Sequence, residues 1–273
     1  MTPRLPRMSS RTLRALPTLL RVGVAETVAY RAEFLVWILT TTMPLVMLAL
    51  FTTVADEAPF RGFASDDMVA YYLSVLIVRN VTSSWVAWQI GEEIRMGSMS
   101  MRLLRPLHPF VALAAAHVAA IPFRCIVALP IAIVLLLGSG GSALATEPLQ
   151  LAVLAPSLAL AWLITFAIMF AIGSLAFFVT RVMGMLNLYF AVFMLLSGYL
   201  LPIEWLPTPI LRVAEWSPFR FMLSLPIELM TRELSTARVF GLMTAQLGWT
   251  VASVALALSV WRLGVRRFEA VGG

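Results

Sequence analysis

The sequence Ile90-Gly-Glu-Glu-Ile-Arg-Met-Gly-Ser-Met-Ser-Met-Arg-Leu-Leu-Arg-Pro-Leu-His-Pro109 is a polar interruption between two long apolar stretches of the chain. We call residues 91–109 the foot. Two X-Pro steps, at Pro106 and Pro109, end it. Its apolar positions recur at helical spacing, which predicts a short helix that buries one side and shows charge on the other. The apolar positions are Ile90, Ile94, Met101 and Leu104, and the charged ones are Glu92, Glu93, Arg95, Arg102 and Arg105.

The overall composition identifies the chain as an integral membrane protein. Its 273 residues are 60% hydrophobic and only 12% charged, and its mean hydropathy is +0.90. No soluble domain of this size is that apolar. About six helical spans of ~20 residues fit this length with short connections, which leaves no room for a second, soluble domain. We therefore predict an all-α integral membrane protein in which residues 1–273 form a single transmembrane domain.

The apolar stretches predict where the six spans lie. They are separated by short charged connections and by a flexible Gly/Ser turn at 138–142. Two prolines, Pro122 and Pro130, are expected to interrupt the third span. The predicted spans are roughly 32–54, 67–90, 111–137, 149–179, 183–201 and 239–261.

Arginine supplies all 20 basic residues, and its distribution predicts the orientation of the chain. With the N-terminus inside the cell, thirteen arginines fall on the inner side and five on the outer side. Cytoplasmic loops of membrane proteins carry an excess of basic residues, so both termini and the foot are predicted to be cytoplasmic. The two remaining arginines, Arg79 and Arg124, fall within predicted spans.

The residue types that are scarce exclude several classes of function. An ordinary phosphate-binding loop needs a lysine, and the chain has none, so it cannot itself carry that nucleotide-hydrolysing site. The sequence pI near 10.4 does not indicate nucleic acid binding, because the arginines are dispersed at span ends. One cysteine, Cys125, and two separated histidines, His108 and His117, predict neither a disulfide within the chain nor a metal site.

Residues 8–30 precede the first span and have two faces. Leucine and valine recur at helical spacing, and arginines fall on the opposite face, which predicts an amphipathic helix lying on the inner leaflet. Pro17 indicates a kink or a later start of this helix. The alternative is an unstructured basic tail.

The segment 202–236, which we call the Pro-rich segment, cannot be one regular span because it contains five prolines. Its prolines interrupt helical hydrogen bonding too often for a membrane span, and its composition is too apolar for a solvated loop. Two short helices that dip into the outer leaflet and return would fit, with two tryptophans as interface anchors. Irregular backbone at that depth must be covered by protein or water, so the segment is a candidate outer gate; a plain outer loop packed on the bundle is the alternative. The candidate gate residues are Pro202, Glu204, Trp205, Trp216 and Glu228.

Arg79 lies near the centre of the second predicted span, beside Asn80. A charge at the middle of a bilayer costs roughly 2.5–3.5 kcal/mol on insertion scales, so Arg79 should face protein or water. It is either an anion contact or gate on a translocation pathway, or half of a buried pair with a carboxylate of the Pro-rich segment or of a partner chain. Arg124 is expected to snorkel to the inner headgroups.

The order of these parts resembles the permease subunits of ATP-binding-cassette (ABC) transporters of the type-2 exporter class. That class includes daunorubicin-resistance, O-antigen and teichoic-acid exporters. The sequence Ile94-Arg95-x-Gly97, followed by Leu103-Leu104-Arg105-Pro106-x-x-Pro109, is most similar to a bacterial drug-export-like family. The architectural resemblance covers essentially the whole chain, whereas the sequence motif covers only residues 94–109.

The resemblance implies a role for several segments. Residues 92–105 would be a coupling helix seated in a groove of a separate ATPase subunit, 8–30 a connecting elbow helix, and 202–232 extracellular re-entrant helices. The coupling residues would be Glu92, Glu93, Arg95, Gly97, Leu103, Leu104, Arg105 and Pro106.

The resemblance also implies the partners and the function. Two ABC ATPase subunits would carry the ATP and magnesium, with no cofactor on this chain, and a second permease, identical or related, would complete the pair. The protein is expected in the bacterial plasma (inner) membrane, in contact with membrane lipid. The expected function is export of an amphipathic or apolar solute, drug-like or a natural product, without enzyme activity. Alternatives are a lipid or lipid-linked glycan exporter subunit and, with less support, an integral membrane enzyme.

Overall fold

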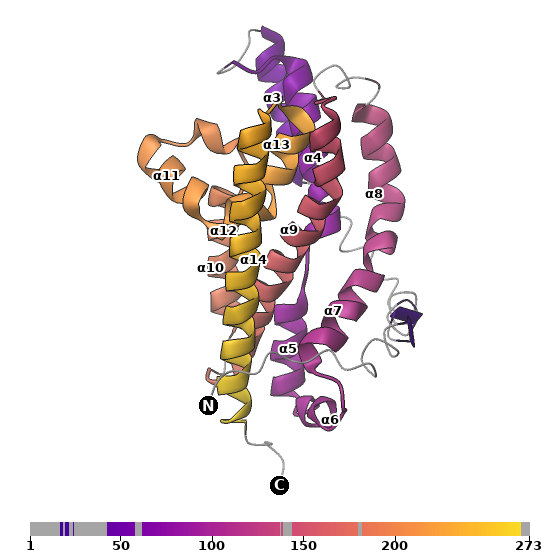
Figure 1. The fold of residues 1–273 in the computed structure, drawn as a ribbon, viewed down its shortest axis with the longest axis vertical. Coiled ribbons are helices and arrows are strands. Elements are labelled where there is room, and N and C mark those ends of the chain that lie inside the picture. The colour runs from indigo at the N-terminus through magenta and orange to yellow at the C-terminus, as the bar shows by residue number, and fades with distance from the viewer. Residues whose placement is uncertain are drawn as a thin grey trace.

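The computed structural model describes residues 43–57, 62–136, 144–179 and 182–268, together with isolated positions among 17–24 and at 138. These ranges are helical and contain no β-strand, which confirms the all-α prediction. Most helices run between two ends of the molecule, with α6 at one end and the beginnings of α4 and α14 at the other (Figure 1). The helices are α3 (Met43–Glu57), α4 (Ser65–Thr82), α5 (Val86–Arg95), α6 (Met99–Leu103), α7 (Pro109–Ala119), α8 (Ile121–Leu135), α9 (Pro148–Ser174), α10 (Met183–Leu196), α11 (Thr208–Trp216), α12 (Pro218–Met222), α13 (Ser224–Thr231) and α14 (Thr236–Val265), with the 3₁₀ helices η3 (Leu175–Phe177) and η4 (Ile203–Trp205).

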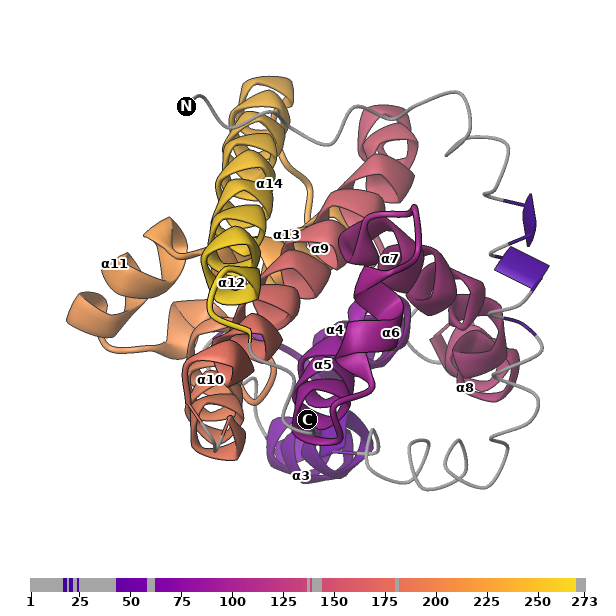
Figure 2. The same cartoon turned by 90° about the horizontal axis from the view of Figure 1, so that it is seen from below.

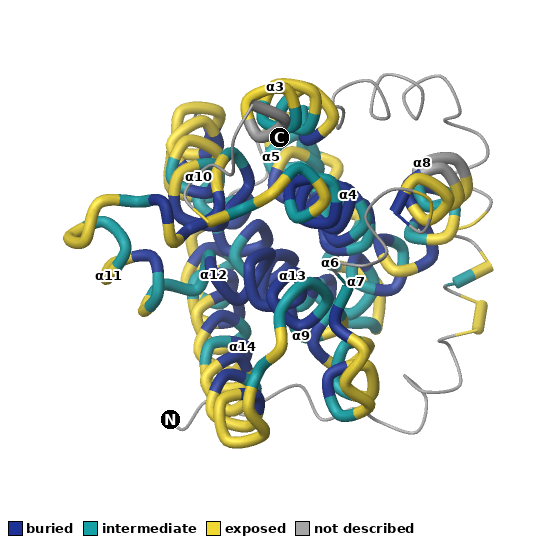
Figure 3. Tube along the Cα trace, turned by 90° about the horizontal axis from the view of Figure 1, so that it is seen from above, coloured by how far each residue is buried: buried dark blue, intermediate teal, exposed yellow. Residues whose placement is uncertain are grey.

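Among the residues that the structure describes, three helical stretches are long and apolar enough to cross a membrane: Pro109–Ile126, Pro148–Phe177 and Thr236–Val265. At 1.5 Å per residue, the 30 residues of α14 extend ~45 Å, which matches a bilayer with its headgroup layers. Helix α9 is apolar on all sides, as expected of a helix surrounded by others. Buried positions gather where α4, α9 and α13 face one another, so α9 is the centre of the bundle (Figure 3).

Two predicted spans are broken in the structure. The range 67–90 is divided because α4 ends at Thr82 and α5 begins at Val86. Serine side chains compete with helical hydrogen bonding, and residues 83 and 84 at this break are both serine. The range 111–137 is divided at Ala120, just before Pro122. Proline is well accommodated in the first turn of a helix, and α8 then continues through Pro130, which was expected to interrupt it.

The fifth predicted span is shorter than expected, since α10 ends at Leu196. The chain turns at Gly198, whose φ of 85° lies in the left-handed region that favours glycine. A Cβ at this position would lie 2.8 Å from the Tyr71 hydroxyl oxygen, which itself donates to the Gly198 carbonyl at 2.6 Å. Glycine is therefore required where the chain leaves α10 and contacts α4.

The Pro-rich segment is not one regular helix, as the sequence predicted. It forms η4 and three short helices, α11, α12 and α13, rather than two. Helix α11 projects from the side of the bundle, whereas α13 is enclosed by α4, α9 and α12 (Figures 1 and 3). The predicted amphipathic helix at 8–30, apart from isolated positions, and the predicted turn at 138–142 lie outside the described residues.

Candidate functional site

The foot is a compact corner formed by the end of α5, the short helix α6 and the start of α7 (Figure 2). Gly97 has a φ of 74°, and this left-handed conformation reverses the chain between α5 and α6. Arg102 on α6 donates from Nε to Oε2 of Glu93 on α5 at 2.6 Å, and its Nη2 bonds the other carboxylate oxygen. Both side chains are largely shielded from solvent, and a bidentate pair of this kind fixes geometry as well as adding energy. The pair therefore holds α6 against α5.

The exposed face of the foot differs from the expected one. Met101 and Leu104 were expected on the buried side, but they are 66% and 78% exposed. The chain reversal at Gly97 breaks the helical phase, so Met99 takes the buried position instead. Met96 is also exposed. We call Met96, Met101 and Leu104 the foot patch.

The remaining predicted coupling residues divide between the two faces of the foot. Arg105 and Pro106 are exposed beside the foot patch, whereas Leu103 packs against the hydrophobic core. Arg95 donates from Nε to Glu92 at 3.0 Å, and this contact lowers the pKa of the Glu92 carboxyl. The foot thus presents both an apolar patch and a charged pair to its surroundings.

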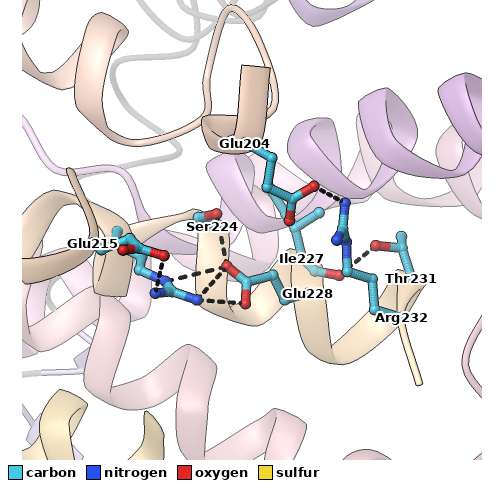
Figure 4. Close-up of polar contacts among 8 residues, drawn as sticks. Glu204, Glu215, Ser224, Ile227, Glu228, Thr231 and Arg232 are labelled. Atoms are coloured by element: carbon cyan, nitrogen blue, oxygen red, sulfur yellow. Dashed lines mark hydrogen bonds and ion pairs between the residues drawn. The ribbon is translucent and has the colours of Figure 1, made fainter. Parts of the chain in front are cut away.

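The Pro-rich segment contains its own ion pairs (Figure 4). Arg220 on α12 donates to Glu228 on α13 at 2.8 Å, and Ser224 donates to the same carboxylate at 3.1 Å. Arg220 and Glu228 are both buried, so each depends on the other for its charge to be tolerated. Arg232 and Glu204 form a second, more exposed pair that links the end of α13 to η4.

Two glutamines fasten the Pro-rich segment to the long helices. Gln150 on α9 donates to the carbonyls of Leu229 and Arg232 at 3.2 and 2.6 Å, and so supplies donors to the last turn of α13. Gln246 on α14 donates to the carbonyl of Phe221 at 3.0 Å. Helices α12 and α13 are therefore bound to α9 and α14 through buried amide contacts.

The two expected interface tryptophans have different surroundings. Trp216 at the end of α11 is 81% exposed, and its role as an interface anchor stays a prediction. Trp205 is only 8% exposed and packs edge-on against Phe51 and Phe63, with ring centroids 5.3 and 5.5 Å apart. Trp205 is thus part of the packing between η4, α3 and the residues before α4, which corrects the expectation that it is an anchor.

Arg79 stacks on aromatic rings. Its guanidinium carbon lies 4.7 Å from the ring centroid of Phe193 and 5.9 Å from that of Tyr199, both within the range of cation–π attraction. Among the described residues it forms no ion pair, and three carboxylates of the Pro-rich segment, Glu204, Glu215 and Glu228, contact Arg220 or Arg232 instead. Asn80 is buried and donates to the Leu76 carbonyl at 2.9 Å, within α4 itself.

A buried polar cluster, which the sequence did not predict, lies where the two broken spans meet. Arg124 on α8 is 2% exposed and donates to the Ser83 hydroxyl at 2.9 Å and to the His117 carbonyl at 3.1 Å; it also bonds the Ser83 carbonyl. His117 contacts the Ser84 hydroxyl and the Gln89 amide oxygen, each at 3.2 Å. Arg124 therefore supplies donors to both breaks, and the expectation that it snorkels to headgroups is wrong.

Comparison with known proteins places the chain in a family. A family model described as ABC-2 family transporter protein matches residues 37–272. The chain belongs to the ABC-2 transporter family. We find no match among curated proteins. ABC-2 permeases are membrane components of ABC exporters that work with an ABC ATPase, so the resemblance read from the foot and from the order of spans is confirmed at the level of the family.

In this ABC-2 permease, the Arg124 cluster could not be found from one sequence. Ser83 and Arg124 are 41 positions apart, and no spacing rule joins them. The available signal was the pair of serines within an apolar stretch, together with an arginine just after Pro122. Serines there indicate a helix break, and a break leaves carbonyl groups that need donors.

We expect Arg124→Met to destabilise the permease markedly. The substitution leaves the Ser83 and His117 carbonyls without their guanidinium donors in a buried place. Each unsatisfied buried group costs about 1–3 kcal/mol, so the purified protein should melt several degrees lower in detergent. Arg266→Met, at an exposed arginine near the chain end, is the matched control and should leave the melting temperature unchanged. Equal melting temperatures for the two variants would contradict the structural role of Arg124.

Proposed function

We propose that the chain is the membrane-spanning half of an ATP-driven exporter in the bacterial inner membrane. It moves an amphipathic or apolar solute, drug-like or a natural product, out of the cell. ATP is hydrolysed with magnesium on a separate ABC ATPase, and two ATPases serve a pair of permeases, identical or related. The absence of lysine supports the assignment of ATP hydrolysis to a separate subunit. An ordinary phosphate-binding loop needs a lysine, so this chain cannot carry one.

The foot patch is the observation that carries this proposal. Exposed apolar side chains are costly in water, and a patch of them rimmed by charge marks a surface that another protein covers. Met101 and Leu104 stand out from the polar end of the molecule while the Glu93–Arg102 pair holds α6 in place. A rigid apolar knob of this kind suits insertion into a groove of an ATPase, which would transmit movement to α5 and α7.

The transmembrane arrangement in this proposal has six spans. These are α3, α4 with α5, α7 with α8, α9, α10 and α14, and residues 8–30 form the elbow helix on the inner leaflet. Both termini and the foot are then cytoplasmic, in agreement with the excess of arginine on that side. The Pro-rich segment lies at the outer side and closes the pathway.

Arg79 and its aromatic neighbours support an amphipathic solute. The guanidinium and the rings of Phe193 and Tyr199 offer a cation beside apolar faces, halfway along the predicted second span. The same arginine favours a second candidate, export of a lipid or lipid-linked glycan, because Arg forms strong bidentate contacts with phosphate. Which group of the solute meets Arg79 distinguishes these two functions.

Reconstitution with an ABC ATPase from the same genome tests the proposed function. We expect one such ATPase to copurify with the permease in a complex of two ATPases and two permeases. Its ATP hydrolysis in lipid vesicles should depend on the presence of the permease. If none of the ATPases binds the permease or changes its hydrolysis rate, the chain is not the permease of an ATP-driven exporter.

The predicted orientation can be checked with single cysteines in a Cys125→Ala background. Ala64 and Ser98 are both exposed and lie at opposite ends of the molecule, before α4 and in the foot. Ala64→Cys should react with an impermeant thiol reagent added to intact cells, and Ser98→Cys should react only after the membrane is opened. The reverse pattern would overturn the orientation.

A further inference from the structure

Five side chains form a continuous series of hydrogen bonds from the foot to the break between α4 and α5. Glu93, which Arg102 on α6 already binds, accepts a hydrogen bond from the Gln89 amide nitrogen at 3.2 Å. The Gln89 amide oxygen and the Ser84 hydroxyl each lie 3.2 Å from one of the two ring nitrogens of His117 on α7. We call these five residues the polar link. It joins three helices and the break through side chains alone.

The carboxylate of Glu93 fixes the direction of every hydrogen bond in the polar link. An ionised carboxylate only accepts, so Gln89 turns its amide nitrogen toward Glu93 and its oxygen toward His117. The neutral imidazole must then donate from Nε2, which leaves Nδ1 to accept from the Ser84 hydroxyl. Ser84 and His117 are buried, where an unpaired polar group is costly, so these bonds persist. The polar link is therefore one ordered network.

The polar link makes α5, α6 and α7 a single unit. These three helices lie together at the foot end of the molecule (Figures 1 and 2). The bond from Arg102 to Glu93 joins α6 to α5 at the foot. The contact between Gln89 and His117 joins α5 to α7 near the breaks, away from the foot. Helices α5 and α7 are thus tied at both ends, and two members tied at both ends cannot splay apart.

Both covalent connections between this unit and the rest of the chain are breaks in helical structure. Residues 83–85, between α4 and α5, are not helical, and Ala120 interrupts the helix between α7 and α8. Arg124 bonds the Ser83 carbonyl at one break and the His117 carbonyl at the other, so the two breaks lie side by side. Short connections of this kind are where changes of φ and ψ can be absorbed.

The unit packs on α9 through apolar groups. Phe110 on α7 meets the rings of Phe166 and Phe170, with centroids 5.2 and 5.0 Å apart. The backbones of α5 and α9 approach closely at Gly173, where a Cβ would lie 2.8 Å from the Ala87 Cα. Packed apolar surfaces can slide by small amounts, whereas the close contact at Gly173 holds the start of α5 in place. A movement of the unit therefore has its axis near the breaks.

We propose that α5, α6 and α7 pivot as one lever about the two breaks when the ATPase moves the foot, and that Gln89 and His117 keep this lever rigid. The inference rests on the proposed function, because the ATPase supplies the movement. Without the tie between Gln89 and His117, a displaced foot would spread α5 and α7 apart, and the displacement would not reach α4 and α8. Gln89 and His117 are thus positioning residues for coupling.

Pairs of spin labels, measured by pulsed electron paramagnetic resonance, test this inference. In a Cys125→Ala background, Ser98→Cys with Val118→Cys reports within the lever, and Ser98→Cys with Val134→Cys reports across the breaks; all three positions are exposed. The ABC ATPase that copurifies is added with a slowly hydrolysed ATP analogue. We expect the first distance to stay constant. The second should shift by about 2–4 Å, because a rotation of about 15° moves the end of a ~15 Å helix by about 4 Å.

The double variant Gln89→Met with His117→Phe removes the tie and keeps the packing. The new ring replaces the imidazole against Trp85 and Phe166, and removing both partners of a hydrogen bond leaves neither unpaired. The melting temperature should therefore change little. In the permease alone, the distribution of distances within the lever should broaden by about 2 Å, the size of a helix shift that packing permits. With the ATPase and the analogue, the distance within the lever should change and the distance across the breaks should not.

Thr165→Val is the matched control, because it removes a buried hydrogen bond within α9 alone. It should give the distances of the unaltered chain. In the unaltered chain, a change within the lever, or no change across the breaks in the ATPase complex, would overturn the pivot. Narrow and constant distances in the double variant would overturn the role of Gln89 and His117, which the permease alone decides. Failure of the unaltered permease to bind any ATPase would instead overturn the proposed function, and the pivot with it.

Discussion

Replacing Met101 and Leu104 by aspartate is expected to abolish export and to release the ATPase from the permease. Both side chains are exposed at the tip of the foot. Burying a Leu or Met side chain in a partner contributes roughly 1.5–3 kcal/mol, and burying an unpaired carboxylate opposes binding further. Loss of both contacts therefore weakens association by about a thousandfold or more. The measurement is copurification of the tagged permease with its ATPase, together with ATP hydrolysis in vesicles.

The matched control exchanges the two side chains, Met101→Leu with Leu104→Met, and keeps the apolar area of the foot patch. This variant should bind the ATPase and support export at close to the unaltered level. Because both positions are exposed, neither variant should change the melting temperature of the permease. Full ATPase binding by the aspartate variant would show that the foot patch is not the docking surface.

The place of the foot could be predicted from sequence, but its exposed face could not. Five charged residues between apolar stretches suffice to locate the corner that α5, α6 and α7 form. The assignment of Met101 and Leu104 to the buried side assumed one continuous helical phase. Gly97, in its left-handed conformation, ends that phase, and Met99 becomes the buried residue. A glycine allows such a reversal without requiring it, so pattern alone cannot decide the face.

The same limit applies to the charged residues inside the bundle. The sequence places Arg79 and Arg124 in predicted spans, where a charged side chain must face protein groups or water rather than lipid. It does not indicate which residues surround each guanidinium, since that depends on contacts between distant segments. Arg124 meets the serine break between α4 and α5, and Arg79 meets Phe193 on α10. The five prolines predicted the irregular backbone of the Pro-rich segment, but not that α13 would become one of the most buried helices of the bundle.

The structure indicates where the Pro-rich segment can separate from its neighbours. Gln150 and Gln246 bind α12 and α13 to α9 and α14, so these four helices should move together. Helix α13 packs against α4 as well as against α9, but the hydroxyls of Tyr71 and Tyr72 on α4 donate to the chain just before the segment, at the carbonyls of Gly198 and Leu200, over 2.6 and 2.9 Å. Beside them lies a pocket of about 300 Å³ lined in part by Phe63 and Arg232. If the segment is an outer gate, it opens at this seam.

Joining the two sides of that seam is therefore expected to stop export. The Arg232 guanidinium carbon lies 5.4 Å from the ring centroid of Phe63, so Phe63→Cys and Arg232→Cys can be bridged by a short bifunctional thiol reagent. Helix α11 lies on the far side of α12 from α4, which makes it a poorer position for the crosslink (Figure 3). In a Cys125→Ala background, the bridged protein should lose export at least about tenfold. It should still bind its ATPase, because the foot is at the other end of the molecule (Figure 1).

A control pair bridges elements that should move together. The Ala145 amide donates to the Met230 carbonyl at 2.8 Å, so Ala145→Cys with Met230→Cys joins α13 to the residues before α9. This bridge should leave export intact, because it crosses no seam that opens. Export is measured before and after the reagent is reduced, so that each protein serves as its own reference. Full export from a protein shown to be bridged between Phe63 and Arg232 would mean that the Pro-rich segment is a fixed cap, held to α4 as firmly as to α9 and α14.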